Sequence, residues 1–129
     1  MKEYHFWVYI LFDERAKATY VGMTNDLTRR MLQHKNRTVR GFTKEKNIHK
    51  LGYFEYYKYA DRAIWREKNL KDWHRAWKYR LIETMNPEWK YLAEELDKVD
   101  IYRTPTAEDL IDPRTGNKIF KALLRPTPQ

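Results

Sequence analysis

The chain has 129 residues, which is enough for one compact domain and too few for a second full one. Its residues are 42% hydrophobic and 16% aromatic, which excludes a disordered chain. Twenty-six Lys and Arg against 18 Asp and Glu give a formal net charge of +8, so a polyanion such as nucleic acid is the expected partner. The absence of cysteine excludes disulfides, thiolate zinc sites and cysteine nucleophiles.

The longest apolar run, Phe6 to Phe12, bears on the location of the protein. It is too short to span a bilayer, and it lacks the basic flank and cleavage site of a secretory signal. We therefore expect a cytoplasmic protein that does not associate with a membrane.

Three runs rich in aromatic and β-branched residues predict a sheet. His5 to Phe12 and Ala18 to Val21 are separated by the polar stretch Asp13 to Lys17, which is typical of a β-hairpin. Lys50 to Tyr57 is a third strand, in which Gly52 indicates a bulge or a close backbone approach. The sequence therefore predicts a three-stranded sheet.

A short helix is expected between the second and third strands, from about Asp26 to Lys35. The side-chain oxygens of Thr24, Asn25 and Asp26 are suited to capping its first turn. Arg30 follows Leu27 by three residues and precedes His34 by four, so these three side chains share one helical face.

The segment from Asp61 to Met85 contains neither Pro nor Gly and predicts one long central helix. Glu67 and His74 fall on its apolar face, where ionisable groups are costly. A functional role explains Glu67, whereas a satisfied core histidine explains His74. The apolar residues of this face are Ala63, Leu70, Trp77 and Leu81.

The sequence after this helix is less regular. Asn86-Pro87 ends the helix, with a structural role for Asn86, and Glu88 to Leu96 predicts a short amphipathic helix. Residues 97–129 carry four of the five prolines and predict a docked or mobile tail. We expect one domain over residues 1–96, followed by this tail.

Charge is distributed unevenly along the chain. Met23 to Lys50 contains eight Lys or Arg against two acids, whereas Ala93 to Asp112 contains seven acids against two bases. The nucleic-acid contacts are therefore expected in the first half. The residues assigned to them are Arg29, Lys35, Arg37, Arg40 and Lys44.

Five side chains form a chemical set: Tyr9, Tyr20, Arg30, His34 and Glu67. Cleavage of a phosphodiester needs a base to activate water, a cation for the charge that develops on phosphorus, and commonly a metal ion for the leaving oxygen. This set offers each part. Taken singly, each residue also has a structural explanation, such as strand aromatics for the tyrosines or a pair with Lys71 for Glu67.

An ordered series of motifs resembles the GIY-YIG nuclease family, specifically its small stand-alone members similar to the N-terminal domain of the excision-repair subunit UvrC. The resemblance covers roughly residues 5–96, and the ordered series is more specific than any one motif. The motifs are Trp7-Val8-Tyr9, Tyr20-Val21-Gly22, Thr24-Asn25-Asp26-Leu27-Thr28-Arg29-Arg30, His34-Lys35, Gly41-Phe42-Thr43-Lys44, Lys50-Leu51-Gly52-Tyr53-Phe54-Glu55, Arg66-Glu67-Lys68-Asn69-Leu70-Lys71 and Asn86-Pro87-Glu88-Trp89.

The resemblance implies an α+β sandwich with an antiparallel three-stranded sheet flanked by helices, and a metal-dependent DNA endonuclease. It implies that Tyr9 or Tyr20 positions or deprotonates the attacking water and that Arg30 neutralises the phosphate. It further implies that Glu67 holds Mg²⁺ or another divalent cation such as Mn²⁺, and that His34 stands where the family has Tyr or His. Structured or branched DNA in repair or recombination is the expected substrate.

Two departures from the family pattern leave other functions open. Trp7-Val8 replaces Gly-Ile, and Met23 stands where some members have Lys, a charge that Lys44 could supply. A nucleic-acid-binding module without catalysis and an RNA-directed nuclease are the alternatives. A protein partner that directs the enzyme to its substrate is a further expectation.

Overall fold

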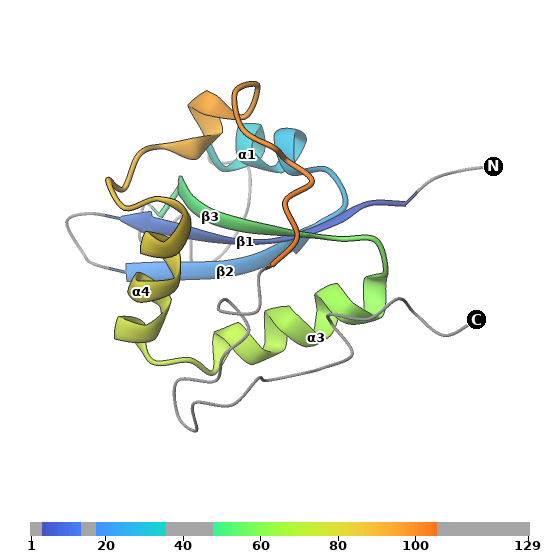
Figure 1. The fold of residues 1–129 in the computed structure, drawn as a ribbon, viewed down its shortest axis with the longest axis horizontal. Coiled ribbons are helices and arrows are strands. Elements are labelled where there is room, and N and C mark those ends of the chain that lie inside the picture. Colours follow the sequence, from blue (N-terminus) through green and yellow to red (C-terminus); the bar gives the residue numbers. More distant parts are fainter. Residues whose placement is uncertain (1–3, 14–17, 36–47, 106–129) are drawn as a thin grey trace.

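The structure, a computed structural model, describes residues 4–13, 18–35 and 48–105. Its elements follow in a simple order along the chain (Figure 1). They are β1 (Phe6–Asp13), β2 (Ala18–Thr24), α1 (Leu27–Lys35), β3 (Lys50–Tyr57), α3 (Ala60–Lys71), α4 (Arg75–Met85) and the 3-10 helix η1 (Leu92–Glu95).

The three strands form one antiparallel sheet in the order β2-β1-β3. Helix α1 and η1 lie on one face of this sheet, and α3 and α4 lie on the opposite side (Figure 1). The predicted α+β class and antiparallel three-stranded sheet are therefore confirmed.

The central strand β1 separates two apolar cores. Val8 and Ile10 pack with the side chains of α3 and α4, whereas Tyr9 and Leu11 pack with those of α1 and η1. A strand covered on both faces is apolar at successive positions, which accounts for the unbroken apolar run in its sequence.

Gly52 produces an irregularity in the pairing of β1 with β3. Ile10 faces Tyr53 while Leu11 faces Leu51, so Gly52 is the extra residue of a bulge. A Cβ atom at Gly52 would also lie 2.9 Å from Cδ1 of Phe12. Both features predicted for this glycine are present.

The prediction of one helix from Asp61 to Met85 is wrong. α3 ends at Lys71 and α4 begins at Arg75. The amides of Asp72 and Trp73 bond back to carbonyls three residues earlier, which tightens and ends α3. The Trp73 side chain then enters the core, where only 6% of it is exposed.

His74 is the N-cap residue that precedes α4, and its side chain is exposed. The prediction of a core histidine at this position is therefore wrong, because the turn between α3 and α4 places Trp73 in the core instead. Trp77 packs partly buried against the same core, as predicted.

The predicted helix over Glu88 to Leu96 is reduced to η1. Trp89 has a positive φ of 55°, which helical backbone does not accommodate. Asn86 is buried, and its Nδ2 donates to the carbonyls of Gly52 and Lys90 at 3.3 and 2.8 Å. Asn86 therefore has the predicted structural role, because it connects the end of α4 to β3.

The chain after residue 96 continues along the sheet. The indole Nε1 of Trp7 donates to the Ile101 carbonyl at 2.6 Å, and the Tyr56 amide donates to the Arg103 carbonyl at 2.7 Å. Val99 and Ile101 pack against the core under α1. Residues 97–105 are thus docked on the fold, and the rest of the predicted tail lies outside the described residues.

Candidate active site

Tyr9 and His34 form the centre of the candidate site. The Tyr9 hydroxyl lies 3.0 Å from Nε2 of His34, and the two residues are 1% and 2% exposed. The half-buried Tyr20 completes an aromatic triangle, with ring centroids 6.4 Å from Tyr9 and 5.9 Å from His34. Residues from β1, β2 and α1 therefore converge at one place.

Gly22 makes room for the Tyr9 ring. It pairs with Tyr9 across the β1–β2 ladder, and a Cβ atom on it would lie 2.5 Å from Cζ and the hydroxyl of Tyr9. The same atom would lie 2.9 Å from Cε1 of Tyr20. β2 continues past Gly22 to Thr24, so it is longer than the strand predicted over Ala18 to Val21.

The start of α1 is fixed by the capping residues predicted from the sequence. The Asp26 amide donates to Oγ1 of Thr24 at 3.1 Å, and the Arg29 amide donates to Oδ1 of Asp26 at 3.1 Å. Leu27 and Met31 are buried against the sheet. This anchoring places His34 against Tyr9.

His34 is neutral at neutral pH. Burial, together with the positive charges of Arg30 and His49, lowers the pKa of His34 from 6.5 to about 4. The tautomer with its hydrogen on Nδ1 leaves Nε2 free to accept the Tyr9 hydroxyl hydrogen. Within the described residues, Nδ1 is buried without a hydrogen-bond partner.

Tyr9 remains protonated in this environment. Burial raises its pKa well above the usual range, Tyr20 and Glu67 raise it further, and Arg30 opposes them. Arg30 and Glu67 thus both lie within electrostatic range of the Tyr9 hydroxyl, although they come from α1 and α3.

Glu67 presents a half-buried carboxylate on α3. Its side chain is 22% exposed, and Oε2 lies 3.7 Å from Nζ of Lys71, which is 51% exposed. An ion pair of this length and exposure contributes at most about 1 kcal/mol to stability. The carboxylate can therefore exchange Lys71 for another cation.

The fit of a divalent cation to this place follows from the donor chemistry. Among the residues that the structure describes, no three His, Asp or Glu side chains gather into a metal-binding group. Mg²⁺ is compatible with such a place, because it retains several waters and commonly takes one or two carboxylates plus phosphate oxygens. Glu67 is the residue that would hold it.

The predicted nucleic-acid contacts are only partly described. Arg29 is exposed on α1, with Nη2 3.5 Å from Oδ1 of Asn25, and so points to solvent. The Lys35 side chain and the residues Arg37, Arg40 and Lys44 lie outside the described part of the chain.

A buried ion pair next to Glu67 was not predicted. Arg66 donates from Nε and Nη2 to the Glu55 carboxylate at 2.9 and 2.8 Å, and both side chains are fully buried. The hydroxyls of Tyr53 and Tyr57 donate to the same carboxylate. The sequence did contain a signal for this pair. Glu55 is an acid at an inward position of an apolar strand, between two tyrosines on the same face.

His49 is the second unpredicted residue near the site. It lies just before β3, and its charge lowers the pKa of His34. Its position between the basic stretch and the third strand gave no separate signal, because a single His there is ordinary in a loop.

A family model described as the GIY-YIG catalytic domain matches residues 5–80. This match spans more than half of the chain, so the chain belongs to the GIY-YIG family. Members of this family are nucleases that act on DNA and generally depend on a divalent metal ion. No curated protein and no solved structure matches the chain significantly.

Proposed function

We propose that this protein is an endonuclease that hydrolyses DNA phosphodiester bonds with the aid of a divalent cation, Mg²⁺ or Mn²⁺. The observation that carries the proposal is the buried contact between the Tyr9 hydroxyl and neutral His34, with Arg30 and Glu67 in electrostatic range. A buried phenol held against an imidazole, within electrostatic range of a guanidinium, is suited to move a proton beside a phosphate.

In this proposal Arg30 binds the scissile phosphate. Through its charge, Arg30 also makes the pKa of the proton acceptor, His34, depend on whether the phosphate is bound. Its charge lowers the pKa of His34 in the free protein. A phosphate anion next to Arg30 offsets that charge, which raises the pKa of His34 and makes Nε2 a better base. The imidazole is thereby activated when the substrate is in place.

The two tyrosines act on the attacking water. The water gives a proton to the Tyr9 oxygen while the Tyr9 hydroxyl hydrogen passes to Nε2 of His34, a path that the 3.0 Å contact permits. Tyr20 borders Tyr9 and His34 and orients the water. Because the pKa of Tyr9 is raised, its oxygen retains the proton it receives.

Glu67 is the residue that would hold the divalent cation. The cation supplies positive charge beside the phosphate and the leaving oxygen when it is bound. The half-buried position of the carboxylate and its weak pair with Lys71 favour this role. We further propose that the natural substrates are structured or branched DNA, as in repair or recombination, as the resemblance to the UvrC domain suggests.

The proposal is tested by incubating the protein with plain duplex, flap and branched DNA, and with RNA of the same form, with and without Mg²⁺. We expect Mg²⁺-dependent nicking of DNA, and loss of nicking in Tyr9→Phe with an unchanged far-ultraviolet circular dichroism spectrum. Tyr4→Phe is the matched control, because Tyr4 is 63% exposed and lies outside the triangle.

Two results would replace this function by its alternatives. Tight DNA binding without cleavage under any metal condition would indicate a binding module. Preferential cleavage of the RNA strands would indicate an RNA-directed nuclease.

A further inference from the structure

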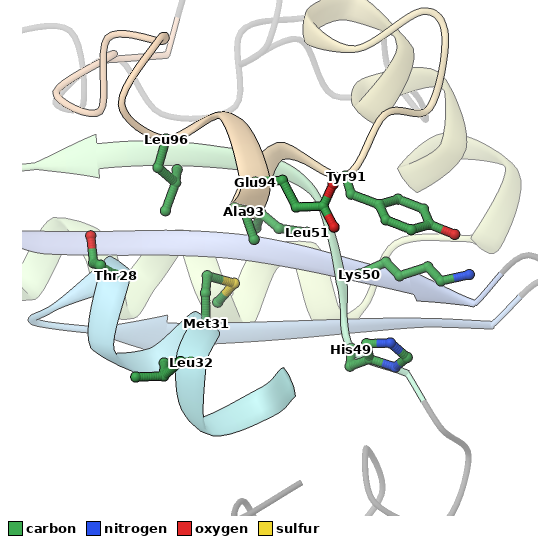
Figure 2. Close-up of a pocket in the computed structure, with 10 residues that line it drawn as sticks. All are labelled: Thr28, Met31, Leu32, His49, Lys50, Leu51, Tyr91, Ala93, Glu94 and Leu96. Carbon is green, nitrogen blue, oxygen red and sulfur yellow. The ribbon is translucent and has the colours of Figure 1, made fainter. Parts of the chain in front are cut away.

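A cavity of about 350 Å³ lies between α1 and η1, and Figure 2 shows the residues that line it. Its volume is within the range of about 300–1,000 Å³ that is typical of small-ligand sites. Met31 and Leu32 reach it from α1, Leu51 from β3, and Ala93 and Leu96 from the η1 side. The middle of the cavity is therefore apolar.

Polar groups surround this apolar centre. His49, Lys50 and the Tyr91 ring lie together at one end, and Thr28 lies at the other (Figure 2). The Nζ atom of Lys50 lies over the Tyr91 ring, 4.6 Å from its centroid. Glu94 adds a carboxylate, so the lining contains both hydrogen-bond donors and acceptors.

The cavity adjoins the candidate active site. α1 contributes Met31 and Leu32 to the cavity and carries Arg30 and His34 to the site. His49 belongs to both places, because it lines the cavity and its charge acts on His34. The proposed phosphate-binding residue Arg30 directly precedes Met31, which lines the cavity.

We infer that the cavity binds one unpaired base of the nucleic acid, from a nucleotide next to the bond that is cut. This inference rests on the proposed function and specifies its substrate class. A base has two apolar faces and an edge of donors and acceptors, which matches an apolar centre with a mixed polar end.

The charges of the lining favour a base over a phosphate group. Glu94 and Lys50 both line the cavity, so its lining carries charges of both signs and lacks the single positive sign that an anion requires. Lys50, at the end next to His49, is placed for the phosphate of the nucleotide whose base enters. A base can enter a cavity between two helices only after it leaves the helical stack, so the substrate has unpaired nucleotides at the cleavage point.

The test uses a fluorescent forked DNA in a series that replaces each unpaired nucleotide near the fork, in turn, by an abasic residue. Binding is measured by anisotropy in EDTA, so that no cleavage occurs. We expect one position at which loss of the base weakens binding by about tenfold, the usual effect of one base contact. All other positions should bind as the unmodified fork does.

Two variants fill the cavity from opposite sides. Ala93→Phe fills it from η1, and Thr28→Phe fills it from α1. Each of these two variants should bind the abasic fork and the unmodified fork with equal affinity, because the filled cavity can no longer accept the base. Ala76→Phe is the control, since Ala76 is exposed on α4 on the other side of the sheet and should keep the tenfold difference.

A uniform abasic series for the unmodified protein would overturn the inference, and so would a tenfold difference that persists in both filled variants. Cleavage of the same fork in Mg²⁺ is measured separately. Cleavage of the fork, together with equal binding of all abasic forks, would contradict the base site and support the nuclease function. Weaker binding at one abasic position, without cleavage, would support the base site and contradict the nuclease function.

Discussion

Gly22 and Gly52 lie in the two outer strands, β2 and β3, and each allows an aromatic ring of β1 to lie against the backbone. A Cβ atom on Gly22 would meet the Tyr9 hydroxyl, whereas one on Gly52 would meet Phe12 in the core. The first glycine therefore shapes the site and the second shapes the fold. The close approach was predictable at Gly52, which lies inside a predicted strand, but not at Gly22, because the strand predicted from the sequence ended at Val21.

The substitution Gly22→Ala separates these roles. The new methyl group must displace the Tyr9 ring, and a misplacement of about 1 Å costs on the order of 100-fold in rate. Gly52→Ala is the matched control, because it should cost about 1–3 kcal/mol of stability through overpacking and leave the rate unchanged. Nicking rates and urea denaturation measure the two effects, and equal losses of rate in both variants would contradict the assignment.

His34 gives the protein a defined response to acid. Its pKa is about 4 in the folded chain and 6.5 in the unfolded chain, so the unfolded state binds the proton first as the pH falls. The free energy of unfolding should therefore decrease as the pH falls from about 6.5 to about 4. Below about pH 4, His34 should cause no further decrease. The acid limb of kcat/KM should lie near pH 4.

The His34→Gln variant should lose most of that pH dependence of stability over the same window. His74→Gln is the control, because His74 is exposed at the start of α4. Urea denaturation at a series of pH values measures both. An unchanged pH dependence in His34→Gln would refute the buried, neutral state of this imidazole.

At the scale of elements, the ion pair of Arg66 and Glu55 joins α3 to the sheet. The carboxylate accepts four hydrogen bonds in a fully buried position, two of them from Arg66. Burial disfavours the charged guanidinium, but the Glu55 carboxylate outweighs this effect and raises the pKa of Arg66. Glu67 follows directly in the helix, so the same anchor fixes the position of the proposed metal ligand.

Arg66→Met should therefore be strongly destabilising, by about 3–5 kcal/mol, because it leaves a buried carboxylate without its cation. Lys90→Met is the control, since Lys90 pairs with Glu88 at 3.4 Å on the surface, where such pairs contribute at most about 1 kcal/mol. Chemical denaturation of both variants gives the comparison. Similar small losses would show that the pair does not anchor α3.

The sequence predicted the strands and α1 well but not the division of the central helix. The strands and α1 were predictable because local patterns specify them: unbroken aromatic runs, and capping oxygens at Thr24 and Asp26. The turn after Lys71 contains no Pro or Gly, and the apolar spacing continues through it. α3 ends where the Trp73 ring packs into the core, and that packing is a tertiary contact that the local pattern does not encode.

The site was predicted by a different kind of evidence. Tyr9, Tyr20, Arg30, His34 and Glu67 were chosen from an ordered set of motifs, since residues this far apart along a chain carry no local signal of proximity. The structure brings three of these rings together and couples the other two residues to Tyr9. Their roles in catalysis remain predictions.

At the scale of the whole molecule, the packed chain extends past the boundary expected at residue 96. Val99 and Ile101 cover the core under α1, and the Trp7 indole bonds to the Ile101 carbonyl. A chain ending at residue 96 should therefore be less stable than one ending at residue 105, by about 2 kcal/mol or more from the exposed apolar side chains. Equal midpoints in urea would show that this segment contributes nothing to the fold.

None of the helices that the structure describes is long and apolar enough to cross a membrane. The net charge of +8 spreads a positive field around the molecule, and binding of DNA by such a surface weakens as salt increases. In the proposed function, a single carboxylate of this basic molecule is essential, because Glu67 would hold the cation on which cleavage depends.

The most direct measurement is the nicking rate of forked DNA as a function of Mg²⁺ concentration for the unmodified protein, Glu67→Gln and the control Glu88→Gln. Glu88 is an exposed acid after α4, so its variant should match the unmodified protein. We predict that the unmodified protein saturates with Mg²⁺ and that Glu67→Gln shows no cleavage while keeping its fold and its DNA affinity in EDTA. An unchanged Mg²⁺ dependence in Glu67→Gln would contradict the account.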